Sequence, residues 1–510
     1  MALRRLTRVL DVQFFRRPLV AGVLLLPVMV MAACQGLSSA KPGNSPVGST
    51  PSPGGGTLAP GFYVATNGDD NNPGTLSQPF ATLGKAQQAM QASSSVKTTY
   101  IRAGTYKPAP VTASCLNGNS SGASLQLSHA DDGETWSVYP PDGYNSAILD
   151  GQSTVGNSGG TGGNGTGCGF SGNTLSNITI VGLQFENYLY SAFWVDNGSN
   201  LTFTSNVVHD LTAAAWGAGA VATNCAPGPL VKNNYMYNLA YTGTDLLTQS
   251  RCAGGISDVV VSGNIIENSC SWPAVHGFGN DQNGGDCGAI YLHDSLRSST
   301  NVQVVNNYVR DVNISSGGAG DYGANGKNGC CAIGVYLDDG TGNVTVIGNI
   351  IAGIMSSCFQ MSDPENNAIT GNICDLAADS GYQSIVIYGW GQRNFNTMTG
   401  NVFVNNIVIS ASTGSGAGFY GSTQTPNPMS ISNNAYFNYV GSSINATGNA
   451  AVGSDTNPVY ENPQLSGWNY HLATGSPVLN SPVLFPGITG GWGPPGFVVP
   501  PNGSAPSCAH

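Results

Sequence analysis

The sequence predicts a single-domain, all-β protein that folds as a right-handed parallel β-helix with a short N-terminal capping helix. Three observations support this prediction: the composition, an internal repeat, and the alternation of apolar residues within each repeat. Only 8% of the 510 residues are charged, against roughly 25% in an average soluble protein, and 71 are glycine. Helical enzymes and coiled coils need many more Lys, Glu and Arg residues. Hydrophobic residues still make up 40% of the chain, which is enough for a core.

The repeat is a short apolar alternation followed by Gly-Asn or Asn-Asn and two further apolar residues. The second residue of each polar pair is Asn206, Asn234, Asn264, Asn307, Asn349, Asn372, Asn401 or Asn434, and Leu183 has the same phase. The shortest spacing is 23 residues, which fits a coil of three short strands and their turns, with insertions in the longer coils. The alternation has period 2 and therefore indicates strands. We expect one buried Asn per coil, stacked into a ladder of hydrogen-bonded amides.

The N-terminal segment predicts export. Residues 1–33 combine five arginines, an apolar run of 13 residues and a small-residue site before Cys34. This segment resembles a bacterial lipoprotein signal peptide, which implies lipidation of Cys34, and an ordinary secretory signal is the alternative. Residues 34–60 form a Ser/Pro/Gly linker, residues 61–492 the β-helix and residues 493–510 a Pro/Gly-rich tail.

The charge of the chain restricts its partners. The formal net charge is −11, and removal of the signal, with its five arginines and Asp11, brings it near −15. Such a surface repels nucleic acid and anionic headgroups, so we expect no nucleic-acid partner and membrane contact only through a lipid at Cys34. The scarcity of cations also disfavours a strongly anionic polysaccharide. We expect a monomer in the cell envelope or on the outer surface, or a secreted protein if Cys34 carries no lipid.

Twelve cysteines in an exported protein predict disulfides rather than metal ligands. With Cys34 set aside the number is odd, so one cysteine is expected to lack a partner. Plausible pairs by proximity in sequence are Cys225 with Cys252, Cys270 with Cys287, and Cys358 with Cys374.

Two parts of the sequence resemble known proteins. The opening FYVATNGDDNNPGTLSQPFATLGKAQQAM and the closing DTNPVYENPQLSGWNYHLATGSPVLN resemble secreted polysaccharide-degrading, pectate-lyase-like β-helix proteins. The segments GGDCGAIYLHD (284–294) and GVYLDDGTGNVTVIGN (334–349) are similar to β-helical glycoside hydrolases of the bacterial β-xylosidase and α-L-fucosidase kind. That resemblance implies that Asp286 and the pair Asp338 and Asp339 are the carboxylates of the site. The first segment departs from the family pattern after its tyrosine, at Leu292-His293-Asp294.

Alignment of the coils on the Asn ladder leads to the same region. It places the strand ends FWVDN, IYLHD, VYLDD and FQMSD in one column, with neighbouring strands about 4.8 Å apart. If Leu292 and Leu337 point inward, His293 and Asp338 point outward, and so do Asp196 and Ser362 in their coils. Asp294 joins the candidate acids. Tyr291 and Tyr336 lie beside them and are candidates for stacking on sugar rings.

Further candidate substrate contacts are His276, Trp390 and Arg393. Each of these residues, like the acids, has a structural alternative: aspartates at strand ends cap turns, and aromatic residues pack coils. No cofactor is expected. A calcium ion at Asp69 and Asp70 is the alternative to an Asx turn, which the spacing favours.

The favoured function is an exported glycoside hydrolase that cleaves a neutral polysaccharide with paired Asp carboxylates on adjacent coils, drawn from Asp286, Asp294, Asp338 and Asp339. One alternative is a polysaccharide lyase or uronate epimerase on the same fold, which needs a base and a cation for the uronate. The other is a non-catalytic, glycan-binding surface lipoprotein. Carboxylates on adjacent coils would favour retention, and a pair two coils apart would favour inversion.

Overall fold

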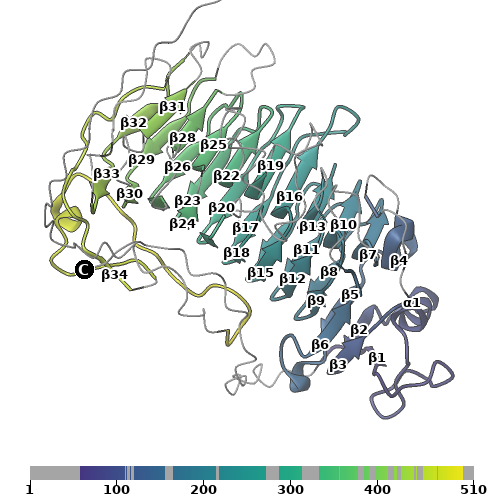
Figure 1. Cartoon of the computed structure of the whole chain (residues 1–510). Helices are drawn as coiled ribbons and strands as arrows, with labels where there is room; N and C mark the ends of the chain where they lie inside the picture. Colours follow the sequence, from purple (N-terminus) through teal and green to yellow (C-terminus); the bar gives the residue numbers. More distant parts are fainter. Residues whose placement is uncertain are drawn as a thin grey trace, which may run out of the picture. The chain divides into compact units, whose positions relative to one another are not determined.

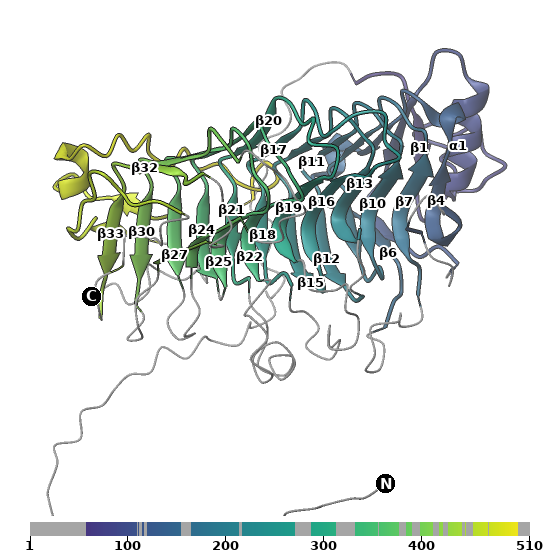
Figure 2. The same ribbon diagram turned by 90° about the horizontal axis from the view of Figure 1, so that it is seen from above.

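The computed structural model describes residues 58–497, with gaps at 110, 112–114, 117–119, 155–164, 214–216, 271–286, 313–331, 355, 377–383, 390–397, 412–417, 422–426, 441–443, 445–451 and 468. In the described residues the chain winds through three long parallel sheets, here called sheets A, B and C, in that order. Figure 2 shows the coils following one another in chain order from helix α1 (Leu83–Ala92) toward the C-terminal end.

Each sheet collects one strand from every coil. Sheet A contains β1 (Phe62–Val64), β2 (Thr98–Ile101), β5 (Thr135–Val138), β8 (Thr179–Val181), β11 (Thr202–Thr204), β14 (Leu230–Lys232), β17 (Val260–Ser262), β20 (Val302–Val305), β23 (Val344–Ile347), β26 (Ala368–Thr370), β29 (Val402–Val404) and β32 (Ser430–Ser432). Sheet B contains β3 (Gly104–Tyr106), β6 (Ala147–Asp150), β9 (Gln184–Glu186), β12 (Val207–Leu211), β15 (Tyr235–Leu239), β18 (Ile265–Glu267), β21 (Tyr308–Arg310), β24 (Ile350–Ile354), β27 (Ile373–Leu376), β30 (Ile407–Ser410) and β33 (Ala435–Asn438). Sheet C contains β4 (Ala123–Leu127), β7 (Cys168–Asn173), β10 (Ser191–Asp196), β13 (Gly219–Asn224), β16 (Thr242–Thr248), β19 (Gly288–Asp294), β22 (Ile333–Asp338), β25 (Ser357–Met361), β28 (Ser384–Tyr388) and β31 (Gly418–Gly421).

The Asn ladder predicted from the sequence is present at the turn between sheets A and B. The backbone N–H of each ladder residue donates to the side-chain oxygen of the next, over distances of 2.8–3.1 Å. The series runs through Asn206, Asn234, Asn264, Asn307, Asn349, Asn372, Asn406 and Asn434. At its end the carboxylate of Asp455 accepts from both the backbone N–H and the side-chain amide of Asn434. Side-chain amides along the ladder also donate to strand carbonyls, which satisfies these buried polar groups.

One predicted ladder residue was wrong. The sequence contains two candidate pairs, Gly400-Asn401 and Asn405-Asn406, on either side of strand β29. The ladder position follows the sheet A strand, so Asn406 belongs to the ladder and Asn401 does not. Asn401 instead accepts from the backbone N–H of Asn367 at 3.1 Å, at the turn that leads into sheet A.

The N-terminal end is closed by the predicted capping helix. Thr82 is the N-cap of α1, and its hydroxyl accepts from the Lys85 backbone N–H at 3.1 Å. The carboxylate of Asp70 accepts from the backbone N–H groups of Ala81 and Thr82 and from the Thr82 hydroxyl, at 2.8–3.0 Å. Met90 and Ala86 of the helix are fully buried against the first coil. The helix therefore covers the apolar end of the stack, and Asp70 secures its first turn.

Four disulfides stabilise the described part of the chain. The three pairs predicted from the sequence are confirmed: Cys225–Cys252, Cys270–Cys287 and Cys358–Cys374. A fourth joins Cys115 to Cys168, a pairing that the sequence did not indicate. Cys34, Cys330, Cys331 and Cys508 lie outside the described residues, so the expected odd cysteine stays a prediction.

The C-terminal segment after β33 returns along the outer face of sheet B (yellow in Figure 1). It contains the antiparallel pair β34 (Leu465–Ser466) and β35 (His471–Leu472). Trp492 packs on Tyr308 with ring centroids 5.3 Å apart, and Phe497 packs on Tyr235 at 4.7 Å. The Asn306 side chain donates to the Gly490 carbonyl at 2.8 Å. This segment, residues 463–497, is called the return segment below.

None of the helices in the described ranges is long and apolar enough to cross a membrane.

Candidate functional site

The candidate site lies on the outer face of sheet C, in the middle coils. The strand register aligns His293 of β19 with Asp338 of β22, as predicted. Leu292, Leu337 and Met361 align with one another and belong to the hydrophobic core. Because side chains alternate along a strand, the residues between these core positions point outward. A first outward row consists of Asp245, Tyr291, Tyr336 and Gln360, and a second contains His293 and Asp338.

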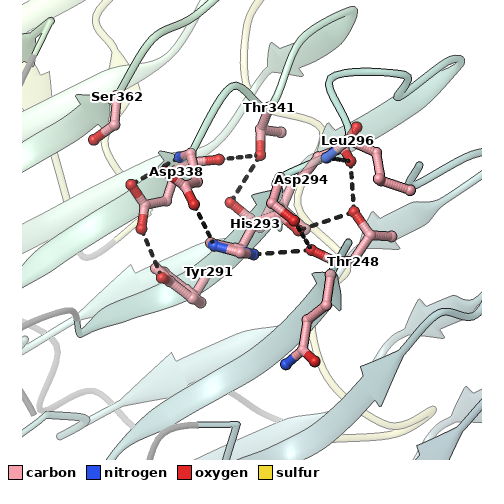
Figure 3. A network of polar contacts seen from close by, with 12 residues as sticks. Thr248, Tyr291, His293, Asp294, Leu296, Asp338, Thr341 and Ser362 are labelled. Carbon is pink, nitrogen blue, oxygen red and sulfur yellow. Dashed lines mark hydrogen bonds and ion pairs between the residues drawn. The ribbon is translucent and has the colours of Figure 1, made fainter. Parts of the chain in front are cut away.

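Asp338 is the half-exposed member of these rows. The Tyr291 hydroxyl, one strand away, donates to its carboxylate at 2.7 Å, and the Asp339 backbone N–H donates to the other oxygen at 2.8 Å (Figure 3). Tyr291 and Tyr336 pack edge to face with ring centroids 5.0 Å apart. Strand β19 begins with Gly288 because a Cβ there would lie 2.8 Å from the Tyr336 Cβ atom. The two tyrosines thus form a packed surface that holds one carboxylate in a fixed orientation.

His293 and Asp339 form a buried pair beside Asp338. The His293 Nε2 atom lies 3.0 Å from an Asp339 carboxylate oxygen, and its Nδ1 atom lies 3.2 Å from the Thr248 carbonyl (Figure 3). Burial by itself would lower the pKa of His293. The Asp339 hydrogen bond and the charges of the neighbouring carboxylates outweigh burial, so this pKa is raised above its ordinary value. The imidazole is therefore held toward its charged form, in which both ring nitrogens donate.

Asp294 takes part in the structure of a turn. One of its carboxylate oxygens accepts from the Thr248 hydroxyl and the Leu296 backbone N–H, and the other accepts from the Ser298 backbone N–H at 2.9 Å (Figure 3). The side chain is fully buried. Asp339 and Asp363 both have φ of 51°, the left-handed conformation that Asp tolerates in turns. These contacts favour the structural alternative for Asp294 over its predicted role as a catalytic acid.

Asp245 is a site residue that the sequence analysis missed. It lies on β16, directly beside Tyr291 in the register, and is 0% exposed. Within the described residues its carboxylate has no side-chain hydrogen-bond partner, and the Gly217 backbone amide lies near it. Burial raises the pKa of Asp245 well above its ordinary value, although the His293 charge and the nearby Gly217 amide oppose this rise. The segment TGTDLLT contains no ladder motif of its own, but aligning Leu246 with Leu292 and Leu337 would have placed Asp245 in the outward row.

Gln360 ends the described polar part of the row on the other side of the tyrosines. It is 1% exposed, and neither its amide nitrogen nor its amide oxygen has a hydrogen-bond partner among the described residues. Ser362, predicted to face outward, is buried with its hydroxyl 3.4 Å from the Tyr336 hydroxyl. The partly exposed Asp338 therefore lies between two buried polar groups, Asp245 and Gln360, that have no side-chain hydrogen-bond partner within the described part of the protein.

Asp286, His276, Trp390, Arg393 and Cys34 fall outside the described residues, so their roles stay predictions.

Two residues of the aligned strands are accounted for by structural contacts. Asp196 is buried and accepts two hydrogen bonds from the Arg251 guanidinium, at 2.8 and 3.0 Å. Tyr388 lies in the core, where its hydroxyl donates to the Met398 carbonyl at 3.0 Å.

The Asp69–Asp70 segment has the hydrogen bonds of a turn. Asp69 accepts from the Asn71 backbone N–H at 2.9 Å, and the Asp70 carboxylate is taken up by the helix cap. No cluster of three or more His, Cys, Asp or Glu side chains with the arrangement of a metal site occurs within the described ranges. These contacts favour the Asx turn over the calcium alternative.

A comparison with family models settles the fold. A model described as the right handed beta helix region matches residues 143–372. Together with the three parallel sheets, this match decides the architecture. The protein is a right-handed parallel β-helix. The predicted fold class is thereby confirmed. No curated protein matches the chain by the same kind of comparison.

Several solved structures resemble this β-helix at low sequence identity. XylC in complex with xylose is 12% identical, with a TM-score of 0.43, over 80% of this chain and 87% of that chain. The GH136 lacto-N-biosidase from Eubacterium ramulus is 11% identical, with a TM-score of 0.43, over 79% and 67%. A rhamnogalacturonan lyase is 13% identical, with a TM-score of 0.37, over 79% and 86%. The functional assignment must therefore rest on the residues of this chain.

Proposed function

We propose that the protein is an exported glycoside hydrolase that cleaves a neutral glycan with inversion, using Asp245 as general acid and Asp338 as general base. One observation carries the proposal: two carboxyl groups face outward from strands β16 and β22, with only β19 between them. Strands two apart are separated by about 10 Å, and Asp338 lies two residues beyond the position aligned with Asp245, so the two Cα atoms are about 12 Å apart. Inverting glycosidases hold their carboxyl groups roughly 6.5–9.5 Å apart, and retaining ones roughly 5–5.5 Å. A pair this far apart is too wide for retention and leaves inversion as the better match.

The two carboxyl groups also lie in different environments, as acid and base must. Asp245 is fully buried, and burial raises its pKa, which favours the protonated carboxyl group that an acid needs. Asp338 is half-exposed and accepts hydrogen bonds from Tyr291 and from the Asp339 backbone N–H. It is the carboxylate that water can reach.

The proposed reaction takes place in one displacement. Asp245 donates its proton to the glycosidic oxygen as the bond from this oxygen to the anomeric carbon breaks. A water molecule attacks the anomeric carbon from the opposite face of the sugar and gives a proton to Asp338. Tyr291 keeps the Asp338 carboxylate oriented, and the charged His293 stabilises the pair of carboxylates at Asp338 and Asp339.

The charges of the site favour a neutral substrate. The outward rows carry Asp245 and Asp338, with Asp339 beside them, and their cation within the described ranges is His293, which Asp339 already engages. A uronate would place a further negative charge beside these carboxylates without a dedicated cation. Four disulfides are typical of an oxidising compartment, which supports export. The proposal includes a lipid on Cys34, which would anchor the protein to the membrane.

Product analysis on a panel of neutral plant and bacterial glycans tests the function. We expect new reducing ends without near-ultraviolet absorbance, and proton NMR should show the inverted anomer as the first product. Asp245→Asn and Asp338→Asn should each lose activity by about 10²–10⁴-fold while remaining folded. Asp258→Asn, at an exposed turn, is the matched control and should keep full activity. Unsaturated products would indicate a lyase, and binding without products would indicate the glycan-binding alternative.

A further inference from the structure

Gln360 is a buried side chain whose position is not explained by the packing of the described residues. It lies beside Tyr336 in the outward row of sheet C. Asp338 follows Tyr336 by two residues on the same strand, β22. Gln360 and Asp338 are therefore diagonal neighbours on one face, with Cα atoms about 8 Å apart. Asp245 lies at the opposite end of the same row, so Gln360 and the proposed acid flank the two tyrosines.

The amide of Gln360 is not compensated within the described part of the chain. A Gln side chain offers two donors and an acceptor with two lone pairs, and neither its nitrogen nor its oxygen has a partner among the described residues. A buried polar group without a hydrogen-bond partner lowers the free energy of unfolding, whereas an apolar side chain of the same shape does not have this effect. Elsewhere on the sheets, a half-buried glutamine has partners: Gln184 donates to Glu186 at 3.0 Å and lies 3.0 Å from His209. The described residues therefore supply no partner for Gln360, although they do for Gln184.

We propose that Gln360 is a specificity-determining residue that binds the sugar held between Asp245 and Asp338, donating from its amide nitrogen to one sugar oxygen and accepting a hydrogen bond from a neighbouring hydroxyl. This inference rests on the proposed function, because it uses the same two carboxyl groups to place the sugar. Adjacent coils are about 4.8 Å apart, close to the width of one sugar ring, so a ring that contacts Asp338 lies one coil from Gln360. A sugar that offers a vicinal pair of hydroxyls satisfies both ends of the amide.

Replacing Gln360 with methionine separates a role in binding from a role in packing. Methionine has nearly the same shape and removes only the amide. We expect Gln360→Met to raise the Tm of the free protein by about 1–3 °C, because a buried polar group without a partner is removed. The matched control is Gln184→Met, which breaks existing hydrogen bonds and should lower the Tm. A Gln360→Met protein that is destabilised as much as the control would overturn the proposal.

Sugar binding provides the second readout. Saturation-transfer NMR is recorded with xylose, galactose, glucose and N-acetylglucosamine on the wild type, Gln360→Met and Gln184→Met. We expect the wild type and the control to bind at least one of these sugars, and Gln360→Met to lose that signal. On a cleaved glycan, Gln360→Met should raise KM at least tenfold while kcat changes less. Unaltered binding in Gln360→Met contradicts the role of Gln360 alone, whereas a wild type that binds none of the four sugars contradicts the proposed function together with it.

Discussion

At the scale of single residues, the charge state of His293 depends on one neighbour. Its Nε2 atom contacts Asp339, and the raised pKa results from this contact and from the surrounding carboxylates acting against burial. A folded-state pKa above the unfolded value stabilises the protein at low pH, and this contribution is lost as the pH rises through the folded-state pKa. His293 therefore couples the stability of the site to pH.

Asp339→Asn should lower the pKa of His293 relative to the wild type. Asparagine keeps the shape and tolerates the left-handed φ of 51° but removes the negative charge, so burial is opposed less strongly. NMR titration of the His293 ring protons measures the change, with His129, an exposed histidine, as an internal reference. An unaltered His293 titration would show that Asp339 does not set its charge state.

At the scale of elements, the first coils under α1 enclose a buried acid. Glu134, which directly precedes β5, is 0% exposed, and burial, with a further contribution from Asp131, raises its pKa to about 8 against the opposing charge of Lys97. The native state then holds a proton that the unfolded chain releases near its ordinary pKa. Ionisation of Glu134 therefore costs no stability at low pH and lowers stability increasingly as the pH rises from about 4.5 to about 8.

Glu134→Gln should remove this loss. The amide does not ionise, so the variant is expected to be more stable than the wild type at pH 7 by roughly 3 kcal/mol and equal to it near pH 4. Denaturant unfolding at a series of pH values measures the difference. Glu461→Gln, at an exposed position, is the control and should follow the wild type. A constant offset between Glu134→Gln and the wild type at all pH values would refute the assignment.

The elements also show how far the sequence was informative. Strand alternation placed Leu292 and Leu337 inside and His293 and Asp338 outside, because period 2 is set by the backbone itself. The hydrogen-bond partners of each acid could not be predicted. Asp294 accepts from the Ser298 backbone N–H of a turn, whereas Asp338 accepts from the Tyr291 hydroxyl of the neighbouring strand, and strand alternation does not reveal either contact. Asp245 was missed because the alignment compared the strand ends of other coils and left out strand β16, although Gly263-Asn264 marks the same coil.

At the scale of the whole molecule, the Asn ladder links eight coils in series. Each internal ladder residue accepts from the coil before it and donates to the coil after it, so loss of one side chain leaves polar groups unpaired on both sides. The ladder was predictable because a buried amide in each coil needs a partner in the next, and only its Asn401 position was misread.

Asn307→Ala should cost more than about 3 kcal/mol of unfolding free energy. The change leaves the backbone N–H of Asn264 and the carbonyl of Val261 without their partners, at about 1–3 kcal/mol each, and the Asn264 side-chain amide keeps only its bond to the Val231 carbonyl. Thermal or denaturant unfolding measures the loss. Gln303→Ala, exposed on the neighbouring strand β20, should change stability by less than about 0.5 kcal/mol. Equal effects of the two substitutions would show that the ladder does not bind the coils together.

The return segment has a consequence for biosynthesis. Its contact between Gly490 and Asn306 joins positions 184 residues apart, and Trp492 and Phe497 shield aromatic rings on strands made long before them. During synthesis the N-terminal coils can form first. The apolar surface of Tyr235, Ile265 and Tyr308 stays exposed to solvent until the return segment has been made. A chain that terminates before Val483 would therefore still form the β-helix, but it would expose this apolar surface and aggregate rather than unfold.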